Sequence, residues 1–257
     1  MKILVINGSP KLERSNTMRM TRAFLEGMKE INSDIEVNQI DVSNMNIRPC
    51  LGCLGCWKMT PGKCVQPADD MAAAIELFCE ADVLLWSFPL YYFSLPGTLK
   101  IFMDRLCPLN KPVIIDRTDG VGNCTHPARY KKEPEQKHIL ISSCGHYSYK
   151  GNYTAVTAQW DLKYGAGRAT TLFCGEGEMF PVPMHADKVE KYLMNCKQAG
   201  RDWASCGTIL EETRQALDEL ILPKDEFIAL GNGYYAHMEK KAAQRAAEKA
   251  AAEAAAK

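Results

Sequence analysis

The sequence predicts an α/β fold built on a parallel β-sheet and followed by further helices. Short apolar runs rich in β-branched residues, such as Lys2–Asn7 and residues 82–88, alternate with segments of helical periodicity. Strands that alternate with helices pair in parallel through right-handed crossovers. The 257 residues, 46% of them apolar and 24% charged, have the composition of a globular protein.

The first strand and the first helix enclose a turn rich in hydroxyl groups. Lys2–Asn7 reads as a strand buried on both faces, and Gly8, Ser9 and Pro10 end it. Ser15 is the expected N-cap of a helix whose apolar pattern begins at Met18.

The remaining elements follow from periodicity and from cap and breaker residues. Further strands are expected at residues 35–40, 82–88, 138–143 and 169–174. Helices are expected at residues 69–79, 96–106, 152–164, 187–204 and 208–222. Residues 107–137 read as mostly irregular, and residues 225–238 have no clear pattern. Residues 239–257 are rich in alanine and lack an apolar face, which indicates a solvated helix or a disordered tail.

The first turn is suited to a phosphate monoester. Backbone N–H groups, hydroxyls and the positive end of a helix dipole converge there, at Ser9, Pro10, Ser15, Asn16 and Thr17. The patterns GxxxxGK[ST] and GxGxxG are both absent, which argues against a nucleoside triphosphate and against a dinucleotide. A small phosphate monoester such as that of FMN remains, and an ordinary capped turn is the alternative.

Two stretches resemble one known family. Asn7-Gly8-Ser9-Pro10 with Ser15-Asn16-Thr17 is similar to the first loop of the flavodoxin-like NAD(P)H-dependent FMN reductases. The stretch PLYYFSLPGTLKIFMDR, residues 89–105, resembles their second flavin loop and the helix after it. The likeness covers roughly residues 1–180.

The resemblance implies a flavodoxin-like three-layer sandwich with a five-stranded parallel sheet of order 2-1-3-4-5, plus a helical C-terminal extension. We expect residues 1–185 to form the FMN-binding domain. Residues 186–238 would form the extension packed on it, and residues 239–257 the Ala-rich helical or disordered tail.

The flavin is expected beyond the carboxyl ends of the first, third and fourth strands, where this strand order reverses. Aromatic residues in the second loop would flank the flat ring. The third loop would bind the pyrimidine edge, with Gly145 allowing close backbone approach. His146 is a candidate proton donor, or else a structural histidine. The expected cofactor contacts are Ser9, Pro10, Ser15, Asn16, Thr17, Pro89, Leu90, Tyr91, Tyr92, Phe93, Ser143, Cys144, Gly145 and His146.

A loop rich in cysteine, glycine and proline, residues 43–67, follows the second strand and is called the cysteine loop below. Cys50, Cys53, Cys56 and Cys64 have the spacing C-x2-C-x2-C-x7-C. This resembles the compact cysteine motif of the iron–sulfur flavoproteins, a branch of the same family, and implies a [4Fe–4S] cluster. Free or oxidisable thiols and a zinc site with four cysteine ligands are the two other interpretations.

The resemblance implies an FMN-dependent NAD(P)H oxidoreductase. Electrons would pass from the nicotinamide through flavin N5 to a quinone, azo, nitro or other small acceptor. The alternative is an iron–sulfur flavoprotein that carries electrons between protein partners. A third hypothesis is a non-catalytic flavin-binding module with a regulatory cysteine loop.

Charge and composition limit the partners and the compartment. The net charge is zero, so neither nucleic acid nor an anionic membrane is expected as a partner. The N-terminus does not resemble a signal peptide, no apolar run approaches the ~20 residues of a membrane span, and the 11 cysteines are odd in number. We therefore expect a cytoplasmic protein with reduced thiols. The family resemblance implies a homodimer or a homotetramer.

Overall fold

The computed structural model of the protein describes residues 1–66, 69–118 and 122–255. Its centre is a parallel five-stranded sheet with the strand order β2-β1-β3-β6-β7. The strands are β1 (Lys2–Asn7), β2 (Glu36–Asp41), β3 (Val83–Pro89), β6 (Lys137–Ser143) and β7 (Ala169–Cys174). Counted within this sheet, the order is 2-1-3-4-5, which confirms the expected topology.

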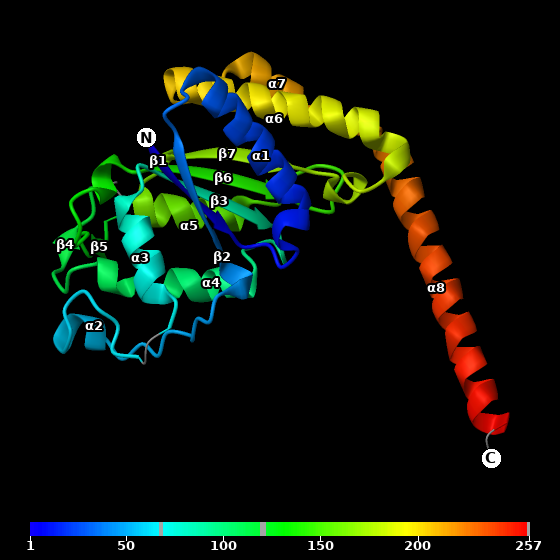
Figure 1. Ribbon diagram of the computed structural model, residues 1–257, viewed down its shortest axis with the longest axis horizontal. Coiled ribbons are helices and arrows are strands. Elements are labelled where there is room, and N and C mark those ends of the chain that lie inside the picture. Colours follow the sequence, from blue (N-terminus) through cyan, green and yellow to red (C-terminus); the bar gives the residue numbers. More distant parts are fainter. Residues whose placement is uncertain (67–68, 119–121, 256–257) are drawn as a thin grey trace.

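Helices cover both faces of the sheet (Figure 1). Along β1, Ile3 and Val5 pack toward one helical layer and Leu4 and Ile6 toward the other, so nearly every side chain of the strand is buried. One layer contains α1 (Asn16–Ile31), α6 (Ala186–Cys206) and α7 (Glu211–Asp218). The other contains α3 (Met71–Glu80), α4 (Gly97–Asp104) and α5 (Thr154–Tyr164).

Several short elements were not expected from the sequence. The cysteine loop contains one turn of helix, α2 (Gly55–Lys58), and residues 107–137 contain the antiparallel pair β4 (Ile115–Asp116) and β5 (Cys124–Thr125). Helix α7 ends at Asp218 and does not reach the expected residue 222. The reason is that the buried carboxylate of Glu176 accepts hydrogen bonds from the backbone N–H groups of Ile221 and Leu222.

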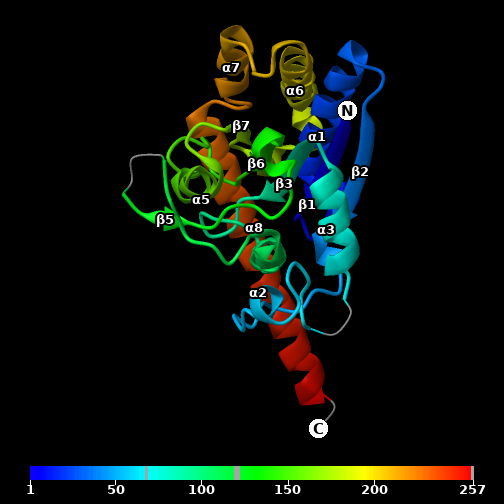
Figure 2. The same cartoon turned by 90° about the vertical axis from the view of Figure 1, so that its left-hand side faces the viewer.

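The unassigned residues 225–238 and the Ala-rich tail form one helix, α8 (Lys224–Ala255). Near its start, Phe227 and Leu230 pack against the core on the α6 side. Most of the remaining helix is exposed and projects away from the body (Figure 2). Residues 256–257 of the expected tail, and residues 119–121 of the insertion, lie outside the described residues. None of the helices within the described residues is long and apolar enough to cross a membrane.

Helices α1 and α6 pack closely at two glycines, Gly27 in α1 and Gly200 in α6. A Cβ at Gly200 would lie 1.9 Å from the carbonyl oxygen of Phe24, and a Cβ at Gly27 would lie 1.8 Å from that of Lys197. Real Cβ atoms do not approach backbone oxygen this closely, so any larger residue must push the two helices apart.

Replacing Gly200 by alanine should therefore lower the free energy of unfolding by about 3 kcal/mol or more, because the backbone of α1 cannot move without disturbing the core. Urea unfolding followed by circular dichroism measures the effect. The matched control is Gly231→Ala in α8, where the added Cβ meets open space among the described atoms. An equal and small effect of both substitutions would contradict the close helix contact.

Candidate functional site

The loops that leave β1, β3 and β6 meet at the carboxyl edge of the sheet and enclose a hollow of about 80 Å³. This is the edge at which ligands bind in open α/β sheets. The residues that line the hollow are Ser9, Lys11, Ser15, Asn16, Thr17, Pro89, Leu90, Tyr91, Ser143, Cys144, Gly145, Gly177 and Glu178. Ten of the 14 expected contact residues are therefore brought together, while Pro10, Tyr92, Phe93 and His146 lie outside this lining.

The first loop presents the start of α1 to the hollow. Ser15 occupies the N-cap position with extended backbone and is 2% exposed. In the part of the chain that the structure describes, its side chain makes no capping hydrogen bond, so the hydroxyl is not used by the helix. Thr17 and Ser143 share a hydrogen bond of 2.9 Å between their hydroxyl oxygens, which ties the first loop to the third.

The second loop is a tight turn that exposes aromatic rings. Tyr91 and Ser94 exchange two backbone hydrogen bonds of 3.0 and 2.9 Å, and the two residues between them, Tyr92 and Phe93, have φ values of 51° and 61°. These are features of a type I′ turn, in which Asn and Gly are usual. A left-handed backbone costs residues with side chains about 1–2 kcal/mol each. Strain of this kind is concentrated at functional sites, and here it holds a fully exposed Tyr92 beside the hollow.

The third loop supplies buried groups and one exposed ring. The Cys144 thiol is buried, and this burial raises its pKa, so it remains a protonated, weakly polar lining group. His146 is exposed and stacks on Phe93, with the ring centroids 5.5 Å apart. This contact connects the second and third loops on the outer side of the hollow.

Three lining residues were missed by the sequence analysis. Lys11 lies inside the first loop, and its backbone N–H donates to the Ser9 hydroxyl over 3.3 Å. Gly177 and Glu178 follow β7, and the Asn16 side-chain amide donates to the Gly177 carbonyl over 2.7 Å. The rule that selected the other loops, the carboxyl end of a parallel strand, also applies to β7 and would have found this fourth wall.

The donor set of the hollow fits FMN. The hydroxyls of Ser9 and Ser15, the first turn of α1 and the cationic Lys11 are the groups that bind a phosphate. The aromatic turn and the glycine of the third loop adjoin them, as a flat ring attached to that phosphate requires.

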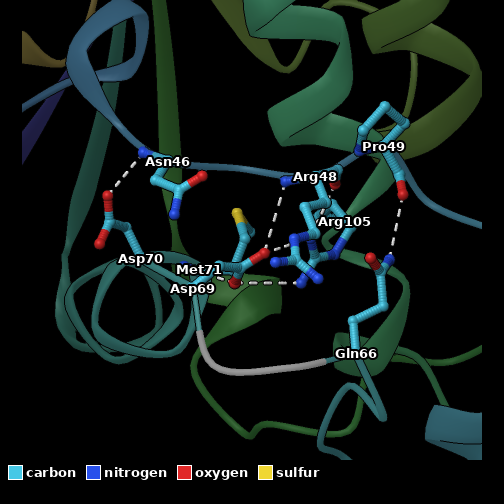
Figure 3. A network of polar contacts seen from close by, with 8 residues as sticks. All are labelled: Asn46, Arg48, Pro49, Gln66, Asp69, Asp70, Met71 and Arg105. Atoms are coloured by element: carbon cyan, nitrogen blue, oxygen red, sulfur yellow. Dashed lines mark hydrogen bonds and ion pairs between the residues drawn. The ribbon is translucent and has the colours of Figure 1, made fainter.

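The base of the cysteine loop is closed by a buried ion pair (Figure 3). Arg105, which follows α4, donates to both carboxylate oxygens of Asp69 over 2.6 and 3.2 Å and to the Arg48 carbonyl over 2.7 Å. The two charged side chains are 2% and 4% exposed. Alongside, the Asp70 carboxylate accepts a hydrogen bond from the Asn46 backbone N–H over 2.7 Å. The ion pair of Arg105 and Asp69 is called the clamp below. With the bond to Arg48, it joins both ends of the cysteine loop to the C-terminal end of α4.

The four cysteines of the motif differ in their exposure within this loop. Cys50 and Cys53 are exposed, Cys64 is half-buried, and Cys56 is buried. Over the described residues, no group of three or more His, Cys, Asp or Glu side chains is arranged to hold a metal ion. The cluster and the four-cysteine zinc site therefore stay predictions from the sequence.

A family model described as a flavodoxin-like fold matches residues 1–186. The chain belongs to the flavodoxin-like fold family. Its observed strand order agrees with this assignment and confirms the fold expected from the sequence.

The relatives of this flavodoxin-like chain include iron–sulfur flavoproteins and FMN-dependent NADH:quinone oxidoreductases. It is 32% identical over 105 residues to an iron–sulfur flavoprotein of Clostridioides difficile, covering 41% of this chain and 45% of that one. It is 26% identical over 211 residues to an FMN-dependent NADH:quinone oxidoreductase of an Exiguobacterium species, covering 76% and 92%. The chain spans about half the length of the first curated relatives that it matches.

Solved structures confirm the fold. An FMN-dependent NADH-azoreductase from Bacillus anthracis, crystallised with FMN, superposes with a TM-score of 0.54 at 19% identity and covers 80% of this chain and 98% of its own. At that level of identity the likeness establishes the architecture alone.

Proposed function

We propose that this flavodoxin-like protein is an FMN-dependent NAD(P)H oxidoreductase that reduces a small quinone, azo, nitro or similar acceptor. The observation that carries the proposal is the hollow at the carboxyl edge of the sheet, where hydroxyls, a helix N-terminus and Lys11 lie beside a strained aromatic turn. The names of the oxidoreductase relatives support the same reading.

The chain's own residues divide into a binding end and an open end. Ser9, Ser15 and the first turn of α1 would hold the phosphate, and the hydrogen bond between Thr17 and Ser143 would hold the first and third loops together beside the cofactor. FMN, when bound, supplies the two-electron chemistry by accepting a hydride from the nicotinamide and passing the electrons on.

The open end would receive both substrates in turn. Tyr92 and Phe93 are exposed, and His146 stacks on Phe93, so these rings form a wall against which a flat nicotinamide or acceptor would lie. The imidazole of His146 is our candidate proton donor to a reduced acceptor.

Replacing Tyr92 by asparagine tests whether this wall selects the acceptor. Asparagine keeps the left-handed turn and removes the ring. We expect kcat/KM for bulky quinone and azo acceptors to change about tenfold, as for one lost aromatic contact of ~1.4 kcal/mol, with NADH oxidation by the flavin nearly unchanged. Two-substrate kinetics should give parallel double-reciprocal lines for both proteins.

Converging lines would show that both substrates occupy the site together and would contradict the alternating use of one flavin face. If the wild type and Tyr92→Asn have equal kcat/KM values for every acceptor, the aromatic turn does not contact the acceptor. Ser94→Asn, a change at the edge of the same turn that leaves the rings in place, is the control.

A further inference from the structure

A fifth cysteine, outside the motif, lies against the cysteine loop. Cys107 begins the short 3-10 helix of residues 107–109 after α4, and its Sγ atom is 3.9 Å from the Sγ atom of Cys56 in α2. The indole N–H of Trp57 donates to the Cys107 carbonyl over 3.1 Å and so holds the two segments together. The two cysteines are 51 residues apart in the sequence.

The other cysteines of the motif lie elsewhere in the loop. Cys64 is half-buried and lines a cavity together with Arg105 and Asp69, the ion pair that closes the loop. Cys50 and Cys53 are exposed to solvent. The thiol of the buried Cys56 therefore contacts Cys107, which is distant in the sequence. It does so although two cysteines of the motif, Cys50 and Cys53, lie six and three residues before Cys56.

We propose that Cys56 and Cys107 form a redox-active dithiol that closes to a disulfide on two-electron oxidation by a hydroperoxide. One thiol sulfur attacks a peroxide oxygen and the O–O bond breaks; that oxygen stays on the sulfur as a sulfenic acid, and the other oxygen leaves with a proton as water or as an alcohol. The second thiol then attacks that sulfur, the S–S bond forms, and the sulfenic oxygen leaves as water with the thiol proton. Two electrons and two protons pass from the dithiol to the oxidant.

The site has both access and the freedom to close. Cys107 lines a cavity of about 390 Å³ together with Trp57 and His126, which is large enough for a small oxidant to enter. Bond formation brings the sulfur atoms from 3.9 Å to about 2.05 Å. Helix α2 has four residues and lies in a loop held at its base by Arg105, so a shift of this size can occur within the loop.

Peptide mapping of the full-length protein tests the proposal. The protein is purified anaerobically with a reductant and a chelator, treated with hydrogen peroxide, blocked with iodoacetamide and digested. We expect a disulfide-linked peptide pair that contains Cys56 and Cys107, with nine of the 11 thiols still alkylated. Cys53→Ser should form the same link, and Cys107→Ser should lose it.

Each other result overturns the proposal. These results are a disulfide confined to residues 50–64, retention of all thiols, or a Cys107→Ser protein that loses two thiols as the wild type does. Stoichiometric iron and sulfide in protein purified anaerobically without the chelator, lost in Cys53→Ser and retained in Cys107→Ser, would also refute it, because Cys56 would then be a cluster ligand. Mapping of the wild type decides the question even if a variant fails to fold, and it needs no bound flavin, so the proposed reductase activity stands or falls separately.

Discussion

Replacing Ser15 by aspartate should lower the affinity for FMN by about 100- to 1,000-fold, because a carboxylate near 4 Å from a phosphate repels it by up to about 4 kcal/mol at an effective dielectric of 20. Aspartate is as good an N-cap as serine, so α1 should keep its start. Riboflavin carries no phosphate, and its affinity should change little. Fluorescence titration of the apoprotein with each flavin measures both values.

Asparagine at the same position is the matched control for Ser15. It has the size of aspartate and the same capping ability without the charge, so FMN binding should weaken only a few-fold. If Ser15→Asp binds FMN as tightly as the wild type, the phosphate does not lie at the start of α1. If riboflavin binding falls equally, the substitution has damaged the fold and not the charge complementarity.

Replacing Asp69 by asparagine should lower the free energy of unfolding by about 3–5 kcal/mol, since it leaves the Arg105 guanidinium buried without its counter-charge. The exposed pair of Lys100 and Asp104 on α4 provides the control, with both side chains about half exposed. Asp104→Asn should cost less than about 1 kcal/mol. Similar losses for both variants would show that the clamp of Figure 3 contributes no more than a surface ion pair.

The same clamp predicts the direction of the pH dependence. Burial by itself raises the pKa of the Asp69 carboxyl, but hydrogen bonds from Arg105 and from the Met71 backbone N–H outweigh it, and the pKa lies below the usual value. A carboxyl with a lowered folded-state pKa stabilises the protein above its unfolded pKa and loses that contribution as the pH falls through the folded value. The difference in stability between wild type and Asp69→Asn should therefore shrink in acid, below about pH 4.

The sheet and three of its loops could be predicted because their determinants are local. Buried parallel strands are short apolar runs, as in Lys2–Asn7, and the carboxyl ends of such strands mark the binding edge whatever follows them. Gly177 and Glu178 follow the carboxyl end of β7. The same rule could therefore have predicted from the sequence that they line the hollow.

The features that could not be predicted depend on contacts between distant residues. The Glu176 carboxylate accepts a hydrogen bond from the Ile221 backbone N–H. Helix α7 therefore ends at Asp218, although the local sequence continues a helical pattern. The Sγ atoms of Cys107 and Cys56 are in contact because the fold places the segment after α4 beside the cysteine loop. No spacing in the sequence predicts this contact. The sequence does not predict a helix at residues 225–238, because Gly231 and Gly233 interrupt the helical pattern. Acidic residues in the first turn and the Ala-rich second half nevertheless favour the helix α8.

We propose that the hollow binds FMN in a form that a nicotinamide can reduce. This is tested most directly by mixing the FMN-loaded protein with NADH or NADPH without oxygen and following the flavin absorbance near 450 nm. We expect complete bleaching by at least one nicotinamide and recovery of the oxidised spectrum when a quinone is added. A flavin that binds tightly and is bleached by dithionite, yet by neither nicotinamide, would contradict the oxidoreductase function.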